Sequence, residues 1–110
     1  MTVSTHILDA MAGRPAAGVA VTLSAADCAG SWLLTESAAT DPDGRHRFTA
    51  ATPPGAYRLV FATGAYFAAR DIAAFYPEVT VTFSVPDGEQ AHYHVPLLLS
   101  PYAYSTYRGS

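Results

Sequence analysis

Four polar side chains stand out against an otherwise apolar, strand-forming sequence: His6, Arg45, His92 and His94. Imidazole titrates nearest to neutral pH, which makes histidine the residue type best suited to general acid–base chemistry. A guanidinium offers a rigid fork of donors that fits carbonyl and carboxylate oxygens. These residue types therefore point to proton transfer beside an oxygen-rich ligand.

Each of these residues also has a simpler interpretation. His6 shares its strand face with Ser4 and Leu8, and it could be an edge histidine exposed to water. His94 could be a structural histidine in the middle of a strand. Arg45 follows a tight turn, where most arginines are only solvated. The spacing alone leaves both interpretations open.

The His92-x-His94 pair places two imidazoles on one strand face, which would also suit a metal ion. Zinc needs three or four ligands, and the single Cys28 and the scattered carboxylates form no matching cluster. The sequence contains no Gly-x-Ser-x-Gly elbow, phosphate loop or dinucleotide fingerprint. Neither a metal nor an organic cofactor is expected.

The segment from His92 to the C-terminus predicts a strand, a turn at Ser100-Pro101 and a second strand that continues to the free carboxylate. Side chains alternate along a strand, so the face that holds the histidines continues into Pro96 and Leu98. The other face holds core-type residues, so one end of this strand is apolar on both faces. We expect another subunit to cover the second face.

The chain ends in Tyr107-Arg108-Gly109-Ser110, and terminal residues fray unless they dock. A chain that ends directly after a strand, with these residue types, indicates a docked tail close to a functional site.

The rest of the chain predicts short strands separated by turns. A typical turn is Asp41-Pro42-Asp43-Gly44, and a short helix is expected within residues 64–72. The expected strands before the C-terminal hairpin are 5–10, 19–24, 32–40, 45–48, 57–62 and 79–85. We therefore predict a single all-β domain over residues 1–110, an antiparallel β-sandwich of about eight strands.

Composition narrows the possible partners and compartments. Half of the 110 residues are hydrophobic and the net charge is −3, which argues against disorder and against nucleic-acid binding. One cysteine cannot form an internal disulfide. No apolar run reaches the roughly 18 residues of a membrane span, and the N-terminus lacks a secretory signal. We expect a cytoplasmic protein without membrane contacts.

Several motifs together resemble the 5-hydroxyisourate hydrolase family, the transthyretin-related enzymes of urate breakdown. The resemblance covers essentially the whole chain. The matching motifs are Ser4-Thr5-His6-Ile7-Leu8-Asp9, Asp43-Gly44-Arg45, Phe75-Tyr76-Pro77-Glu78-Val79, His92-Tyr93-His94-Val95-Pro96-Leu97-Leu98-Leu99-Ser100-Pro101 and Tyr107-Arg108-Gly109-Ser110. One departure is Asp41, where many relatives have Asn, and we expect it to affect turn geometry more than chemistry.

This resemblance implies a transthyretin-like sandwich of two sheets with a short helix after the fifth strand. It also implies a homotetramer, a dimer of dimers, whose active sites lie at subunit interfaces. The implied site residues are His6, Arg45, His94, Tyr107 and Ser110, without a metal or cofactor.

The family reaction opens the ring of 5-hydroxyisourate by attack of water on a ring carbonyl. The product is 2-oxo-4-hydroxy-4-carboxy-5-ureidoimidazoline. The resemblance implies that His94 and His6 activate the water, in an order that the spacing leaves open. Arg45 would bind the substrate and stabilise the oxyanion. Tyr107 would position the ring, and Ser110 would orient a histidine or the water.

Two other functions fit the same fold. A transthyretin-like carrier would hold a small aromatic ligand, but it would have neutral or apolar residues in place of His6, Arg45 and His94. A structural or adhesion sandwich would need no polar groups beside an apolar interface. The sequence favours the hydrolase over both.

Overall fold

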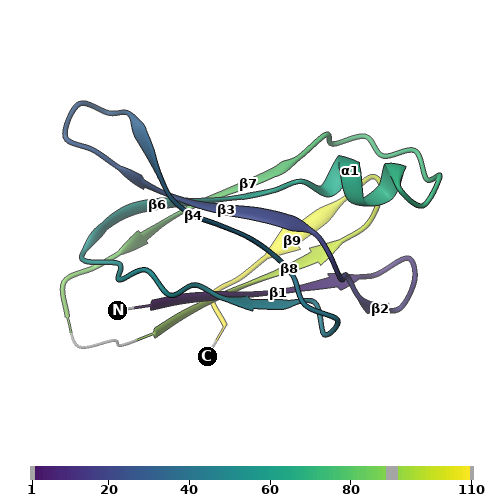
Figure 1. Cartoon of the computed structure of the whole chain (residues 1–110), viewed down its shortest axis with the longest axis horizontal. Coiled ribbons are helices and arrows are strands. Elements are labelled where there is room, and N and C mark those ends of the chain that lie inside the picture. Colours follow the sequence, from purple (N-terminus) through teal and green to yellow (C-terminus); the bar gives the residue numbers. More distant parts are fainter. Residues whose placement is uncertain (1, 89–91, 110) are drawn as a thin grey trace.

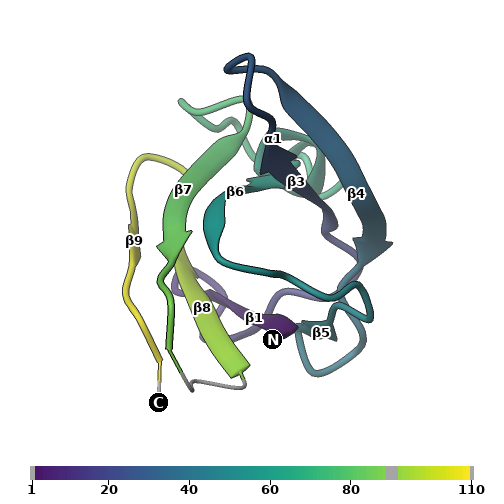
Figure 2. The same cartoon turned by 90° about the vertical axis from the view of Figure 1, so that its left-hand side faces the viewer.

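Two β-sheets face each other in the computed structural model, which describes residues 2–88 and 92–109. Within this part of the chain they contain nine strands, and the one helix, α1 (Thr63–Ala68), lies at the end of the molecule away from the N-terminus (Figure 1). Figure 2 looks along the sandwich from the N-terminal end and shows the two layers. The predicted all-β sandwich with one short helix is confirmed.

The first sheet has the order β2-β1-β8-β9, and β5 also pairs with β1. Its strands are β1 (Thr2–Asp9), β2 (Arg14–Pro15), β5 (Arg45–Arg47), β8 (His92–Leu99) and β9 (Tyr104–Thr106).

The second sheet has the order β4-β3-β6-β7 and is antiparallel throughout. Its strands are β3 (Ala20–Ala26), β4 (Trp32–Ala39), β6 (Gly55–Phe61) and β7 (Val79–Val85).

The core lies between the two sheets and is built from alternate residues of their strands. Alternation turns one set of side chains inward, where burial of apolar surface stabilises the fold by roughly 25 cal/mol per Å². The fully buried members include Val3, Ile7, Val21, Leu23, Leu59, Phe61 and Leu97.

Helix α1 is fixed to the end of β1 through the buried carboxylate of Asp9. The hydroxyl of Tyr66 donates to this carboxylate over 2.7 Å, and the backbone N–H groups of Met11 and Ala12 donate to its other oxygen. A buried carboxylate needs such donors, because an unpaired charge in the core is strongly destabilising.

Three details differ from the prediction. Arg14–Pro15, which lies between the expected strands 5–10 and 19–24, forms the short strand β2. β8 pairs with β1 in parallel, because the whole second sheet separates the two strands in sequence and supplies the long connection that parallel pairing requires. The last strand ends at Thr106, and the tail returns to the sheet only at Gly109.

Candidate active site

Three strands bring the polar residues onto one outer face of the first sheet. In β1, Ser4 and His6 alternate with buried residues and so point away from the core. Antiparallel β5 places Arg45 opposite His6, and parallel β8 places His94 opposite Ser4. The structure thus assembles two imidazoles and a guanidinium in adjacent rows of one face.

The turn before β5 fixes the position of Arg45. Gly44 has φ +75°, and a Cβ there would lie 2.5 Å from the carbonyl oxygen of Ile7, so only glycine fits without displacement. The carboxylate of Asp41 accepts the backbone N–H groups of Asp43 and Arg45, each over 2.9 Å. These contacts agree with the expectation that Asp41 acts on turn geometry.

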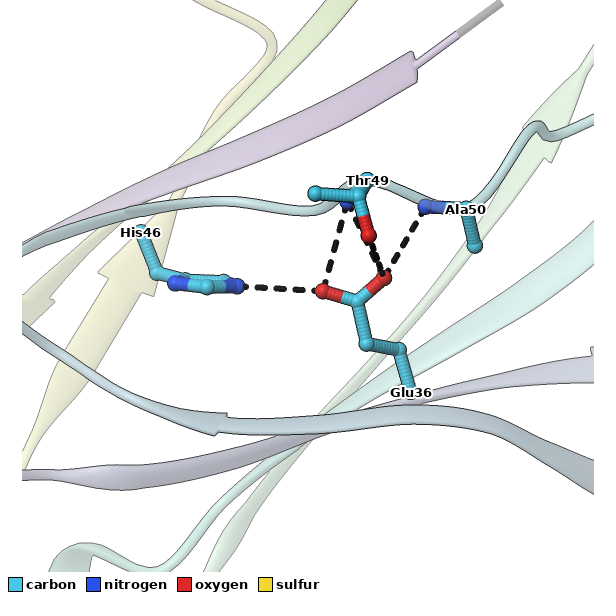
Figure 3. A network of polar contacts seen from close by, with 4 residues as sticks. All are labelled: Glu36, His46, Thr49 and Ala50. Carbon is cyan, nitrogen blue, oxygen red and sulfur yellow. Dashed lines mark hydrogen bonds and ion pairs between the residues drawn. The ribbon is translucent and has the colours of Figure 1, made fainter.

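On its inner side, β5 is tied to the second sheet by Glu36 of β4. Figure 3 shows its carboxylate between the ring of His46 at 3.3 Å and the backbone N–H groups of Thr49 and Ala50. Burial raises the pKa of Glu36, but these hydrogen bonds outweigh it and the net pKa is lowered. The network holds β5 so that Arg45 remains on the outer face.

His94 is half-buried and held from two sides. Its Nδ1 lies 2.7 Å from the hydroxyl oxygen of Ser4. On the other side, the N–H of Gly109 donates to the His94 carbonyl over 2.8 Å, and a Cβ at Gly109 would lie 2.6 Å from the imidazole Cδ2. The described part of the tail is therefore docked, as predicted, and it lies against His94.

The surroundings of His94 favour its neutral form. Burial lowers the pKa of His94 below its ordinary 6.5, and electrostatic interaction with His6, His92 and Arg45 lowers it further. A ring that is neutral at pH 7 can accept a proton, as a general base must.

Arg45 and His94 line one depression of about 400 Å³ on this face. Its other lining residues are Ser4, Thr5, Asp41, His46, Arg47 and His92. The lining is rich in hydrogen-bond donors and includes two guanidinium groups, which suits a small, planar ligand with several carbonyl oxygens.

His6 is not among the residues that line this depression, but it pairs in register with Arg45 and acts electrostatically on His94. Within the described residues no side-chain hydrogen bond engages its ring, so both nitrogens can meet a ligand. The structure therefore brings His6, Arg45 and His94 together, although they lie far apart in sequence.

Tyr107 lies on a different side of His94. It is 65% exposed and lines a second depression of about 360 Å³ between β7 and the C-terminal segment, which His94 also borders. Ser110, the other predicted tail residue, lies outside the described residues.

The apolar end of the outer face differs in part from the prediction. Leu8 and Leu98 are paired in register and are 38% and 44% exposed, so this pair leaves an apolar surface. Pro96, however, is buried within the single chain, and the prediction that it requires cover from another subunit is wrong. It sits on a central strand, flanked by β1 and by the segment that contains Thr106.

Three further residues of the site were not singled out from the sequence: Thr2, Ser4 and Arg47. Ser4 and Arg47 share a row with His94, and Thr2 pairs with His92. The available signal was spacing, because residues i and i+2 of a strand share a face. Ser4 and Arg47 lie two residues from His6 and Arg45, and Thr2 lies two residues from Ser4.

Neither a group of three potential metal ligands nor a helix able to cross a membrane occurs in residues 2–88 and 92–109.

The fold and this polar face define a transthyretin-like β-sandwich with imidazole and guanidinium groups on the outer surface of one sheet. The model of the HIUase/Transthyretin family matches residues 3–109, and the chain belongs to that family. The family predicted from the motifs is confirmed.

The chain is similar to several proteins named 5-hydroxyisourate hydrolase. It is 47% identical to that of Caulobacter vibrioides, over 97% of this chain and 96% of the relative, and 46% identical to that of Salmonella typhimurium, over 97% and 79%. The solved Klebsiella pneumoniae 5-hydroxyisourate hydrolase superimposes with a TM-score of 0.88 at 38% identity, with both chains covered completely.

Sea bream transthyretin, solved in complex with thyroxine, superimposes with a TM-score of 0.93 at 32% identity, over 97% of this chain and 93% of that one. The backbone therefore fits a hydrolase and a carrier about equally well. The functional distinction has to come from the side chains of the site.

Proposed function

We propose that this chain is a hydrolase of urate breakdown that opens the ring of 5-hydroxyisourate with water. The observation that carries the proposal is the convergence of His6, Arg45 and His94 on one face. Relatives that share 41–47% of their residues with the chain are named as enzymes of this activity, some of them as probable ones, which supports the same substrate.

The histidines supply the base in the proposed reaction. The water oxygen attacks a ring carbonyl carbon while one water proton passes to an imidazole nitrogen. His94 is the preferred acceptor, acting as a pair with His6, because its lowered pKa keeps it neutral. The C–N bond of the ring then breaks, and the nitrogen that leaves takes up a proton.

Arg45 supplies the electrostatic part. Negative charge develops on the attacked carbonyl oxygen, and a guanidinium at the edge of a partly desolvated depression stabilises it. Tyr107 is proposed to position the ring and Ser110 to orient a histidine or the water. The product is 2-oxo-4-hydroxy-4-carboxy-5-ureidoimidazoline, and these groups suffice without a metal or cofactor.

A homotetramer, a dimer of dimers, completes the proposal. The exposed pair Leu8 and Leu98 lies on the same outer face as His6 and Arg45, so a subunit packed against it would also enclose the site. Tyr107 and the tail could then serve the site of a neighbouring subunit.

A carrier function is the second candidate, favoured by the superposition on sea bream transthyretin with thyroxine. A carrier needs affinity for its ligand but no base, and the charged lining around His94 and Arg45 argues against it.

A single ultraviolet assay separates the two. Freshly prepared 5-hydroxyisourate should disappear much faster with the protein than by spontaneous decay, and at protein concentrations far below that of substrate. Decay at the spontaneous rate, with or without tight binding of the compound, would refute the hydrolase.

A further inference from the structure

A row of hydrogen-bonded side chains runs behind His94 across β1 and β8. The hydroxyl of Thr2 lies 2.6 Å from Nδ1 of His92, and Nε2 of the same ring lies 2.8 Å from the hydroxyl of Ser4. The Ser4 hydroxyl also lies 2.7 Å from Nδ1 of His94. All three distances are those of good hydrogen bonds, and the parallel register of β1 and β8 creates the row.

The number of protons limits how this row can be arranged. Each hydroxyl has one proton to donate, and each neutral imidazole has one N–H. If Ser4 donates to His92, then His94 must donate its Nδ1–H to Ser4, and its Nε2 is left bare. If Ser4 donates to His94, then Nε2 of His94 has the proton. A third arrangement has both rings donating to Ser4 and Thr2 donating to His92, and it again leaves Nε2 of His94 bare. These three arrangements satisfy all three contacts with neutral rings.

We propose that Ser4, supported by His92 and Thr2, is a positioning residue for His94 that accepts its Nδ1–H and presents Nε2 as the base. This inference rests on the proposed function, since it assigns the nitrogen that takes the proton from water. Ser4 also lines the depression beside His94, and the role proposed here is exerted through its hydrogen bond to the His94 ring.

The row also accounts for the proton after the attack of water. When Nε2 of His94 gains a proton, the Nδ1 proton can move to Ser4, the Ser4 proton to His92 and the Nδ1 proton of His92 to Thr2, whose own proton passes to solvent. One proton enters at His94 and one leaves at Thr2. The row has then changed from the first arrangement to the second, and charge does not accumulate on His94.

The electrostatic surroundings favour neutral rings in this row. Burial lowers the pKa of His92, and Arg47 lowers it further. Among the described residues, the other charged or titratable groups that line the depression beside this row are Arg45 and His46 on β5 and Asp41 in the adjoining turn. His6 on β1 acts electrostatically on His94.

The tautomer can be measured directly and without substrate. ¹⁵N NMR of the imidazole nitrogens in the folded wild-type protein at pH 7.5 should show His94 with a protonated Nδ1 and a bare Nε2. Ser4→Ala should shift the ring toward the Nε2–H form. A wild-type ring already in the Nε2–H form, or one unchanged by Ser4→Ala, would overturn the proposal.

Kinetics provide the second measurement. Ser4→Ala should lower kcat about 10- to 100-fold with little change in KM, the effect of losing one hydrogen bond to a group that becomes charged. Ser4→Thr restores the hydroxyl and should recover most of kcat. Ser37→Ala, on exposed β4, is the matched control and should behave as the wild type.

A purely structural role would make Ser4→Ala and Ser4→Thr lose activity together with stability, and that result would also overturn the proposal. If the wild type shows the Nδ1–H tautomer but does not hydrolyse 5-hydroxyisourate, the proposed function fails while the role of Ser4 in orienting His94 is supported.

Discussion

At the scale of single residues, the site depends on how its neighbours set the protonation and placement of His94. The ring is half-buried, lies close to Arg45 and two other histidines, and is confined between Ser4 and Gly109. Each feature can be changed by one substitution, so each makes a separate prediction.

The first residue-scale prediction concerns pH. The lowered pKa of His94 means that the folded chain binds this proton less readily than the unfolded chain. Activity and the contribution of neutral His94 to the free energy of unfolding are therefore both present above pH 6.5. Both are lost as the pH falls through the pKa of His94 in the folded chain. The acid limb of kcat/KM should have its midpoint below pH 6.5.

Removing a positive charge close to His94 should move the acid limb of the kcat/KM profile to higher pH. Arg45→Gln should raise its midpoint as well as reduce the rate, whereas Arg58→Gln in the second sheet should leave the profile unchanged. A wild-type midpoint above 6.5 would contradict this account of His94.

The second residue-scale prediction concerns Gly109. Its backbone is outside the left-handed region, so alanine is tolerated there, but the new Cβ would lie 2.6 Å from the His94 ring. The ring must move, and a displacement near 1 Å can cost about 10²-fold in rate. Gly109→Ala should therefore lose activity and keep its Tm. Full activity would show that the ring has more freedom than these contacts imply.

The sequence indicated His6, Arg45 and His94 because their residue types are rare in a chain of apolar strands. Thr2, Ser4 and His92 could not be recognised as a connected row in the same way. Their contacts join residues 88 to 90 positions apart, and they depend on the parallel register of β1 and β8, which no local pattern specifies.

At the scale of elements, β5 is placed by its turn and by the Glu36 network rather than by its own length. It has only three residues, so the turn at Gly44 largely determines where Arg45 lies.

This placement predicts different results for two glycines with the same backbone angle. Gly18 and Gly44 both have φ +75°, but a Cβ would meet nothing within 4 Å at Gly18 and would overlap the Ile7 oxygen at Gly44. Gly18→Ala should lose about 1–2 kcal/mol of unfolding free energy from backbone strain alone. Gly44→Ala should lose more and should also lose activity. Chemical denaturation and the decay assay compare them, and equal losses with equal activity would contradict the assigned role of the turn.

Turns and alternating strands were predictable because their signals are local, as at Asp41-Pro42-Asp43-Gly44. Strand β2 was missed because two residues are too few to show alternation. The end of β9 was missed because strand pairing stops where the tail lies against His94, which is a tertiary contact.

At the scale of the whole molecule, the sandwich leaves an exposed apolar pair, Leu8 and Leu98, on the face that holds the site. Family membership and fold class were both predictable from motifs spread over the chain. The sequence predicted only in part which apolar residues require another subunit to cover them. Pro96 is covered within the chain, because its burial depends on segments on both sides of β8.

The proposed tetramer makes one prediction at this scale. Leu98→Lys would place a charge in the subunit interface and should convert the assembly to smaller species, measured by sedimentation or light scattering. Leu34→Lys, at an exposed leucine on β4, is the control and should keep the wild-type mass. An unchanged mass for Leu98→Lys would place the interface elsewhere.

The central claim is that two imidazoles brought together by β1 and β8 activate the attacking water. The most direct measurement is the decay of fresh 5-hydroxyisourate with wild type, His6→Asn and His94→Asn, each corrected for spontaneous decay. Loss of a general base typically costs about 10²–10⁴ in rate. We predict a loss in this range for His94→Asn and a clear loss for His6→Asn, with both proteins folded. Turnover near the wild-type rate in both variants would contradict the account.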